Sequence, residues 1–215
     1  MPDCTAPSGF VSRLQASPVI PVVTITDPAV AGDLARAIRE GGLNFLEITL
    51  RSREGLTAIT RATGAGLTIG AGTVITAAQA KVAIGAGAEF IVCPGFDAEV
   101  VQLCVAAGVP VVPGVATPTE LMVARAAGVG LAKVFPAREL GGPGYVRALS
   151  AVFPDQLFLP TGGVEPESAP DYLSIASVVA VGGSWITPSA SVAARDWDAI
   201  TGLALSAAKM ASELR

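Results

Sequence analysis

The sequence predicts a single (β/α)8, or TIM, barrel, and two observations carry the prediction. Short apolar runs rich in β-branched residues recur along the chain, and each is followed by a helix-like stretch rich in Ala and Leu and by a turn that contains glycine. Strict alternation of this kind is typical of parallel sheets, either open or closed. Eight units favour closure, and 215 residues are enough for one domain of this type.

The expected elements follow one another in a regular order. We expect strands at Val19–Ile25, Phe45–Arg51, Thr68–Val74, Phe90–Pro94, Pro110–Ala116, Leu131–Pro136, Leu157–Thr161 and Val178–Gly182. The first intervening helix is expected over Asp27–Glu40, because Asp27 can cap it and Pro28 suits its first position. Later helices are expected to open at Thr76, Asp97, Thr117-Pro118 and Glu165-Pro166, and three to close at Gly85 or Gly87, Gly108 and Gly128.

The ends of the chain complete the domain prediction. Residues 1–16 are expected to form an extension or a short helix across the bottom of the barrel, and residues 17–215 the barrel itself. An open sheet that binds a dinucleotide would carry a GxGxxG turn after its first strand. Thr24-Ile25-Thr26-Asp27-Pro28 occupies that place instead, which favours the closed barrel.

Composition excludes several classes of function. The net charge of −4 gives no reason to expect nucleic acid as a partner. Two long stretches lack charge, Val100–Thr119 and Tyr172–Ala194, but both are broken by Gly, Pro or Ser, so no membrane span is expected. The N-terminus has no secretory pattern, and the cysteines (Cys4, Cys93, Cys104) are odd in number, which fits reduced thiols in the cytoplasm. With no histidine in the chain, acid–base chemistry must use carboxylates, lysine or water.

One lysine lies in an apolar strand. Alternation along Leu131–Pro136 places Leu131, Lys133 and Phe135 on one face. Burial among apolar neighbours favours the neutral amine, which is a nucleophile. Taken alone, the pattern favours a strand-end lysine whose stem is buried and whose ammonium reaches water.

A second strand brings polar groups to the barrel interior. Along Phe45–Arg51, the side chains of Glu47, Thr49 and Arg51 share the face opposite the apolar one. Buried charges are costly unless they are paired or functional. This strand by itself therefore allows a Glu47–Arg51 ion pair, a half-exposed strand or a catalytic role. Titratable groups from two strands in one barrel shift the balance towards an active site.

Glycine-rich strand ends provide further candidates. Thr73 and Pro94 end their strands beside glycines, where a ligand could approach the backbone or where the chain could simply turn. The last two strands end in paired glycines, Gly162-Gly163 and Gly182-Gly183, with Ser184 next to the second pair. Backbone N–H groups at these two loops often hold phosphate in barrels, although ligand-free glycine turns would look the same.

Five ordered motifs together resemble the 2-keto-3-deoxy-6-phosphogluconate (KDPG) and 4-hydroxy-2-oxoglutarate (KHG) aldolase family, from about Pro18 to the C-terminus. They are Glu47-Ile48-Thr49-Leu50-Arg51, Gly70-Ala71-Gly72-Thr73-Val74, Lys133-Val134-Phe135-Pro136-Ala137, Pro160-Thr161-Gly162-Gly163-Val164 and Gly182-Gly183-Ser184-Trp185. The resemblance implies a homotrimeric class I aldolase of the Entner–Doudoroff pathway on a (β/α)8 barrel.

The resemblance also implies a role for individual residues. Lys133 would form the Schiff base and Glu47 would move protons. The substrate would be bound by Arg51, Thr73, Pro94, Phe135 and Thr161, with Arg51 and Thr73 at its pyruvate end and Thr161 nearby. The phosphate would be held by Gly162, Gly163, Gly182, Gly183 and Ser184. The substrates would be a 2-keto acid and an aldehyde, and neither a cofactor nor a metal ion is expected, because the imine itself withdraws electrons.

Two other functions and a second substrate are compatible with the same residues. A phosphosugar isomerase could use Glu47 as base with Lys133 as an electrostatic partner, and a non-catalytic barrel could bind sugar phosphates in the glycine loops. Among aldolases, the epimeric 2-keto-3-deoxy-6-phosphogalactonate is an alternative substrate. Covalent trapping of Lys133 distinguishes the aldolase from the isomerase and the binding barrel.

Overall fold

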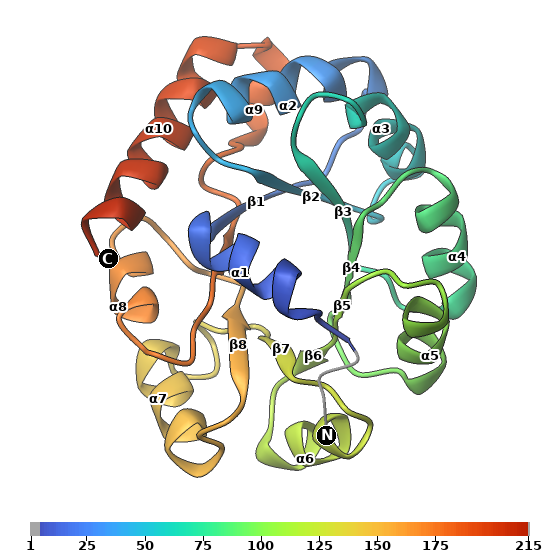
Figure 1. Ribbon diagram of the computed structural model, residues 1–215. Helices are drawn as coiled ribbons and strands as arrows, with labels where there is room; N and C mark the ends of the chain where they lie inside the picture. The colour runs from blue at the N-terminus through green and yellow to red at the C-terminus, as the bar shows by residue number, and fades with distance from the viewer. Residues whose placement is uncertain (1–4, 215) are drawn as a thin grey trace.

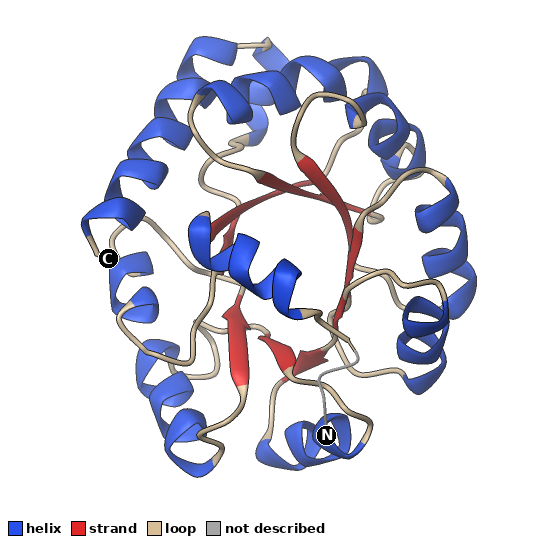
Figure 2. Ribbon diagram, viewed as in Figure 1, coloured by secondary structure: helices blue, strands red, loops and turns tan. Residues whose placement is uncertain are grey.

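The computed structural model describes residues 5–214, and it confirms the predicted barrel: parallel strands form a ring inside a ring of helices (Figures 1 and 2). The strands are β1 (Val19–Val23), β2 (Phe45–Thr49), β3 (Thr68–Gly72), β4 (Phe90–Val92), β5 (Val111–Val112), β6 (Gly114–Val115), β7 (Leu131–Val134), β8 (Leu157–Pro160) and β9 (Val181–Gly183). They pair in the orders β5-β4-β3-β2-β1-β9 and β6-β7-β8.

The fifth predicted strand is split, which is why nine segments build eight barrel positions. Pro113 interrupts Pro110–Ala116, so that β5 pairs with β4 and β6 pairs with β7. Proline lacks the N–H that a continuous ladder requires. At the other junction of the two sheets, β8 and the segment around β9 are joined by the bridges Phe158↔Val178 and Thr161↔Gly182.

Helices follow the strands around the outside of the ring. They are α1 (Ser8–Ala16), the 3-10 helix η1 (Pro28–Val30), α2 (Ala31–Glu40), α3 (Gly55–Ala62), α4 (Ala77–Gly85), α5 (Ala98–Ala106), α6 (Pro118–Ala126), α7 (Gly142–Val152), α8 (Ala169–Leu173), α9 (Ser189–Ala194) and α10 (Trp197–Glu213). The predicted caps Thr76, Asp97 and Thr117 accept hydrogen bonds from the first turns of α4, α5 and α6. Asp27 caps η1 rather than an α-helix, by accepting from the Ala29 N–H at 3.0 Å.

One helix end agrees with the prediction and one helix start does not. Gly108 has a φ of 68° after α5, and Val109 N–H donates to Cys104 O across the helix end. This is the left-handed glycine termination that the sequence suggested. The prediction that Glu165-Pro166 opens a helix is wrong, because Glu165 O accepts from Ser168 N–H in a turn and α8 begins only at Ala169.

The core has two parts, one between the ring and its helices and one inside the ring. Helix α1 lies across the opening of the ring in Figure 1, and its Phe10 packs against Phe45 and Phe90 with ring centroids 6.0 and 5.6 Å away. Both partners are at strand starts, so α1 covers the end of the barrel opposite to the strands' carboxyl ends.

Within residues 5–214, every helix is too short or too polar to cross a membrane.

Candidate active site

Lys133 and Glu47 meet inside the barrel near the carboxyl ends of their strands. Lys133 Nζ lies 3.9 Å from Glu47 Oε1, and the two side chains are 4% and 1% exposed. Ala132 and Val134 pack into the helix-facing core instead, as do Leu46 and Ile48. The alternation predicted for both strands is therefore present in the structure. The two groups are beyond direct hydrogen-bond reach at this distance, and they can exchange a proton through a water molecule or after a small approach when substrate binds.

Lys133 packs beside an aromatic ring, and two buried polar atoms of the candidate site lack a hydrogen-bond partner among the described residues. Lys133 Nζ lies 4.9 Å from the centre of the Phe135 ring, and Phe135 is partly exposed at the top of β7. Glu47 Oε2 and Thr161 Oγ1 are both buried without a hydrogen-bond partner among the described residues. Buried polar atoms are nearly always satisfied in native proteins, so these two atoms indicate a bound ligand or water.

Gly72 and Thr73, at the end of β3, shape the space beside Glu47. A methyl group on Gly72 would overlap with Glu47 Oε1, so the carboxylate can occupy its place only because residue 72 has no side chain. Thr73 has a φ of 59°, which is unfavourable for a β-branched residue. Strained backbone of this kind is concentrated at functional sites.

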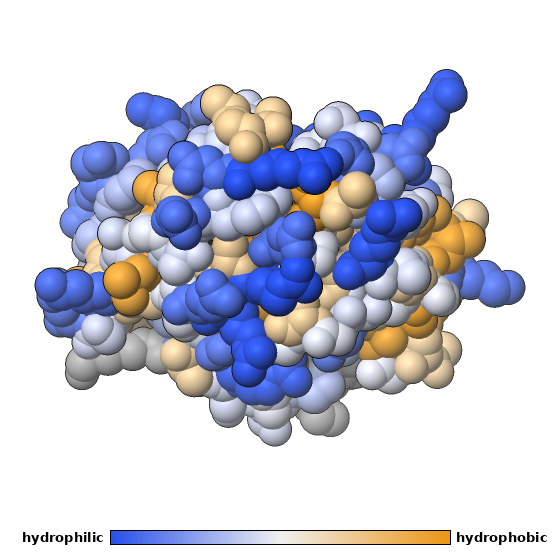
Figure 3. All heavy atoms as spheres, turned by 90° about the horizontal axis from the view of Figure 1, so that it is seen from above, coloured by the Kyte–Doolittle hydropathy of each residue, from blue (hydrophilic) through white to orange (hydrophobic). Residues whose placement is uncertain are grey.

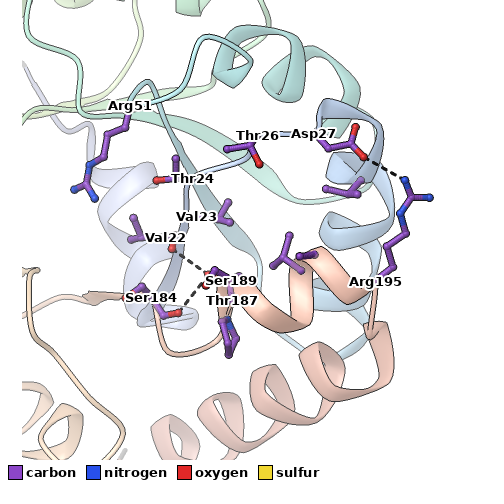
Figure 4. A pocket seen from close by; sticks show the side chains of 14 residues that line it. Val22, Val23, Thr24, Thr26, Asp27, Arg51, Ser184, Thr187, Ser189 and Arg195 are labelled. Atoms are coloured by element: carbon purple, nitrogen blue, oxygen red, sulfur yellow. Dashed lines mark hydrogen bonds and ion pairs between the residues drawn. The ribbon is translucent and has the colours of Figure 1, made fainter.

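A pocket of about 760 Å³ opens above β1, β2 and β9 and contains two of the predicted substrate-binding residues, Arg51 and Ser184 (Figure 4). Arg51 does not point into the barrel interior as alternation predicted, because β2 ends at Thr49 and Arg51 lies in the following turn, exposed. In Figure 4, Thr24 lies between Arg51 and Ser184. Thr24 Oγ1 is 2.7 Å from Oγ1 of the buried Thr49.

Several lining residues of this pocket were missed by the sequence analysis. Thr24 is one of them, and Arg195 Nη2 pairs with Asp27 Oδ2 at 3.2 Å along its rim. Arg195 ends α9, far from Asp27 in the sequence, so no local pattern could have placed the two together. Pro94 lies elsewhere, in a separate pocket of about 370 Å³ with Phe96, Glu120 and other residues of the β4 and β6 loops.

The two glycine pairs differ in structure. Gly162 and Gly163 have positive φ angles of 95° and 68°, which are typical of the predicted glycine loop. Gly182 and Gly183 do not form such a loop, because both lie within β9 and are buried. A side chain on Gly182 would meet Thr161 Oγ1 at 2.6 Å, and one on Gly183 would overlap with the Trp185 ring. The second pair therefore makes room for neighbouring side chains.

The remaining titratable groups near the site are thiols. Burial raises the pKa of Cys93 to about 12, and nearby Cys104 and Asp97 add to the rise while Lys133 opposes it. Burial also raises the pKa of Cys104 to about 11. Cys93 and Cys104 are free thiols, as predicted, while Cys4 lies outside the described residues. Within the described part of the chain, no group of three or more Cys, Asp or Glu side chains could hold a metal ion.

Comparisons with known proteins give a consistent result. The model of the KDPG and KHG aldolase family matches residues 10–203. The chain is 42% identical to the 2-dehydro-3-deoxy-phosphogluconate aldolase of Treponema pallidum, over 86% of this chain and 89% of that protein.

Two solved structures are similar over most of their length. The 2-keto-3-deoxy-6-phosphogluconate aldolase of Zymomonas mobilis, determined with 3-phosphoglycerate, matches with a TM-score of 0.87 and 40% identity over 92% of this chain and 93% of that one. The KDPG aldolase of Legionella pneumophila, in which pyruvate is captured as a covalent carbinolamine, matches with a TM-score of 0.88 and 38% identity over 92% and 97%.

Proposed function

Since the chain belongs to the KDPG and KHG aldolase family, we propose that it is a class I aldolase that reversibly cleaves 2-keto-3-deoxy-6-phosphogluconate to pyruvate and glyceraldehyde 3-phosphate. It is then a carbon–carbon lyase. The observation that carries the proposal is the buried Lys133 Nζ at 3.9 Å from Glu47 Oε1. A nucleophilic amine beside a proton-transferring carboxylate is the pair of groups that imine chemistry requires.

Lys133 begins the reaction by attacking the C2 ketone of the substrate. Its neutral amine adds to the carbonyl carbon, and a proton reaches the former carbonyl oxygen to give a carbinolamine. Loss of water from the carbinolamine forms a protonated imine. Glu47 lies where it can supply and remove the protons of both steps. The captured carbinolamine in the Legionella pneumophila relative supports this first stage.

Cleavage follows from the positive charge of the imine. A base takes the proton of the C4 hydroxyl, the C3–C4 bond breaks, and its electron pair moves towards the iminium nitrogen to leave an enamine of pyruvate. Glyceraldehyde 3-phosphate departs. Protonation of the enamine at C3 and hydrolysis of the imine then release pyruvate and the free Lys133 amine. Glu47 is our proposed base and acid, because its Oε2 is buried and lacks a partner among the described residues.

The rest of the site is proposed to hold the two ends of the substrate. Arg51 would bind the carboxylate with its planar guanidinium, helped by Thr73 and Thr161, with Phe135 packing beside the imine. The phosphate would lie at Gly162, Gly163 and Ser184, with Gly182 and Gly183 as the small residues beside it. Pro94 would contribute from the separate pocket that it lines. The 3-phosphoglycerate in the Zymomonas mobilis relative supports a site for a phosphorylated acid.

The assembly and cellular location are part of the same proposal. A homotrimer would cover exposed apolar side chains such as Ile75, Met122 and Val123, which are 57%, 62% and 53% exposed. Figure 3 shows apolar residues gathered at its right edge, the side that carries α4 in Figure 1. Sedimentation velocity tests this, with three times the mass of the chain expected. Free buried thiols fit a reducing compartment such as the cytoplasm.

The activity is tested by coupling pyruvate release to lactate dehydrogenase and following NADH. KDPG should be cleaved, and KHG should be a second substrate, as the family's scope suggests. Running the assay with the 6-phosphogalactonate epimer decides which sugar acid is preferred. A folded protein that releases no pyruvate from any of the three substrates would overturn the proposal in favour of the isomerase or the binding barrel.

A further inference from the structure

The proposed phosphate site lacks a side-chain cation of its own. Its residues, Gly162, Gly163 and Ser184, offer backbone N–H groups and one hydroxyl. A phosphate monoester carries close to two negative charges at neutral pH, and arginine is over-represented where phosphate is recognised. An arginine at the carboxyl ends of the strands would therefore stabilise a phosphate bound there.

Two of the arginines at the carboxyl ends of the strands have another role: one is already ion-paired, and the other is assigned to the substrate carboxylate. Arg195 lines the large pocket, but its guanidinium is paired with Asp27 at 3.2 Å. Arg51 follows β2, the strand of Glu47, and is the group that we assign to the substrate carboxylate. Arg53 lies in the same loop as Arg51, after β2, and Arg138 lies in the loop after β7.

Arg138 is attached to the glycine loop by its backbone and by its stem. Its N–H donates to Gly162 O at 3.0 Å, next to the bond from Ala137 N–H to Thr161 O at 2.9 Å. A methyl group on Gly163 would lie 2.5 Å from Cβ and 2.7 Å from Cδ of Arg138. The aliphatic stem therefore runs along Gly163 at van der Waals distance, which keeps the guanidinium within reach of this loop.

The charge of Arg138 is available for a ligand. The side chain is exposed, and it forms no ion pair with any residue of the described part of the chain. Its effect on the surroundings is visible at the buried Tyr172: burial raises the pKa of this phenol, Glu139 adds to the rise and Arg138 opposes it. Glu139, the next residue in the chain, has the opposite effect on Tyr172 but forms no ion pair with Arg138 in the described part of the chain.

We propose that Arg138 is a further phosphate-binding residue of this aldolase, and that its guanidinium closes over a phosphate held by Gly162 and Gly163. The inference rests on the proposed function and adds to it a residue that selects phosphorylated over unphosphorylated substrates. Because the guanidinium is exposed, its contribution depends on ionic strength.

The test compares three variants in the pyruvate-release assay. Arg138→Gln should raise KM for KDPG roughly tenfold, as loss of one charge-assisted hydrogen bond predicts, and leave KM for the unphosphorylated KHG unchanged. Arg138→Lys keeps the charge and should recover most of the loss. The control is Arg147→Gln, an exposed arginine of α7 whose only described partner is Ser174 Oγ at 3.4 Å, and it should alter neither KM.

A binding measurement tests the role of Arg138 without relying on catalytic turnover. Calorimetric titration with 3-phosphoglycerate should give an affinity roughly tenfold weaker in Arg138→Gln than in the wild type. Equal affinities, or KM values that change equally for KDPG and KHG, would overturn the role of Arg138. A wild type that binds 3-phosphoglycerate but cleaves no substrate would instead refute the proposed function, so the two failures are distinguishable.

Discussion

Lys133 on β7 and Glu47 on β2 belong to different sheets of the barrel, yet Nζ and Oε1 lie 3.9 Å apart in its interior. Only the closure of the ring brings these two strands to face each other. The pairing also leaves Glu47 Oε2 buried and without a hydrogen bond to a described residue, which is costly unless a ligand uses it. Imine formation at Lys133 requires a proton-transferring group in this position.

Replacing Glu47 with glutamine tests its role in proton transfer. Glu47→Gln keeps the size of the side chain but cannot carry the proton, so kcat for KDPG cleavage should fall by about 10²- to 10⁴-fold. Circular dichroism should be unchanged. A variant that retains more than about a tenth of the wild-type kcat would show that another group or bound water moves the protons.

Gly72→Ala tests whether the position of the Glu47 carboxylate matters. The added methyl group would overlap with Oε1 and displace the carboxylate, so kcat should fall on the order of 10²-fold. Gly202→Ala is the matched control, because a methyl group there meets nothing within 4 Å on α10. The control should keep full activity and gain about 0.5–1 kcal/mol in the free energy of unfolding. Full activity in Gly72→Ala would contradict the assignment.

The backbone of Thr73 should lower the stability of the fold, while its hydroxyl should contribute to pyruvate binding. Thr73→Gly relieves a left-handed backbone at φ 59° and should raise the free energy of unfolding by up to about 1 kcal/mol, while Thr73→Ala keeps the strain. Both variants lose the hydroxyl, so both should weaken pyruvate binding to a similar extent. Urea denaturation and pyruvate titration measure the two effects. Destabilisation by glycine would mean that the backbone of residue 73 is not strained.

The buried thiols predict a loss of stability at alkaline pH. In the fold the pKa of Cys93 is raised from 9.0 to about 12, and that of Cys104 to about 11, so the unfolded chain releases these protons first. Thiol burial therefore contributes stability that is fully present below pH 9.0 and is lost as the pH rises towards 12. In a Cys4→Ser background, replacing Cys93 with alanine should flatten this part of the pH–stability curve, and an unchanged slope would rule out the thiol as its cause.

Accessibility gives a second readout for the same thiols. In the Cys4→Ser background, a disulfide reagent should not react with the native protein at pH 8, but should titrate two thiols in denaturant, because the thiolate is the reactive form. Rapid reaction of the native protein would contradict their burial.

The interior positions of Glu47 and Lys133 could be predicted from the sequence because they follow from a pattern within each strand. Alternation along β2 and β7 puts Glu47 and Lys133 on the interior faces, and this depends only on the period of a strand. It placed Arg51 wrongly, since the pattern continued past the point where β2 ends at Thr49. The alternation of side chains does not predict the residue at which a strand ends.

Features that depend on contacts between distant segments could not be predicted. The Asp27–Arg195 pair, the place of Thr24 in the large pocket and the packing of Arg138 on Gly163 all arise from loops that meet only in the folded barrel. The sequence pattern placed Gly182 at the end of the last strand and Gly183 just after it. In the structure both glycines lie within β9, where their lack of a side chain leaves space for Thr161 and Trp185.

The most direct test of the account is reduction of the protein with sodium borohydride in the presence of pyruvate, followed by intact mass measurement and peptide mapping. Borohydride reduces an imine to a stable secondary amine, so one reduced pyruvate adduct per chain is expected, on Lys133, and it should be absent from Lys133→Ala. The exposed Lys209, which pairs with Glu213 at 4.0 Å, is an internal control that should remain unmodified. A folded protein that forms no adduct, or carries it on another lysine, would contradict the assignment of Lys133 as the Schiff-base residue.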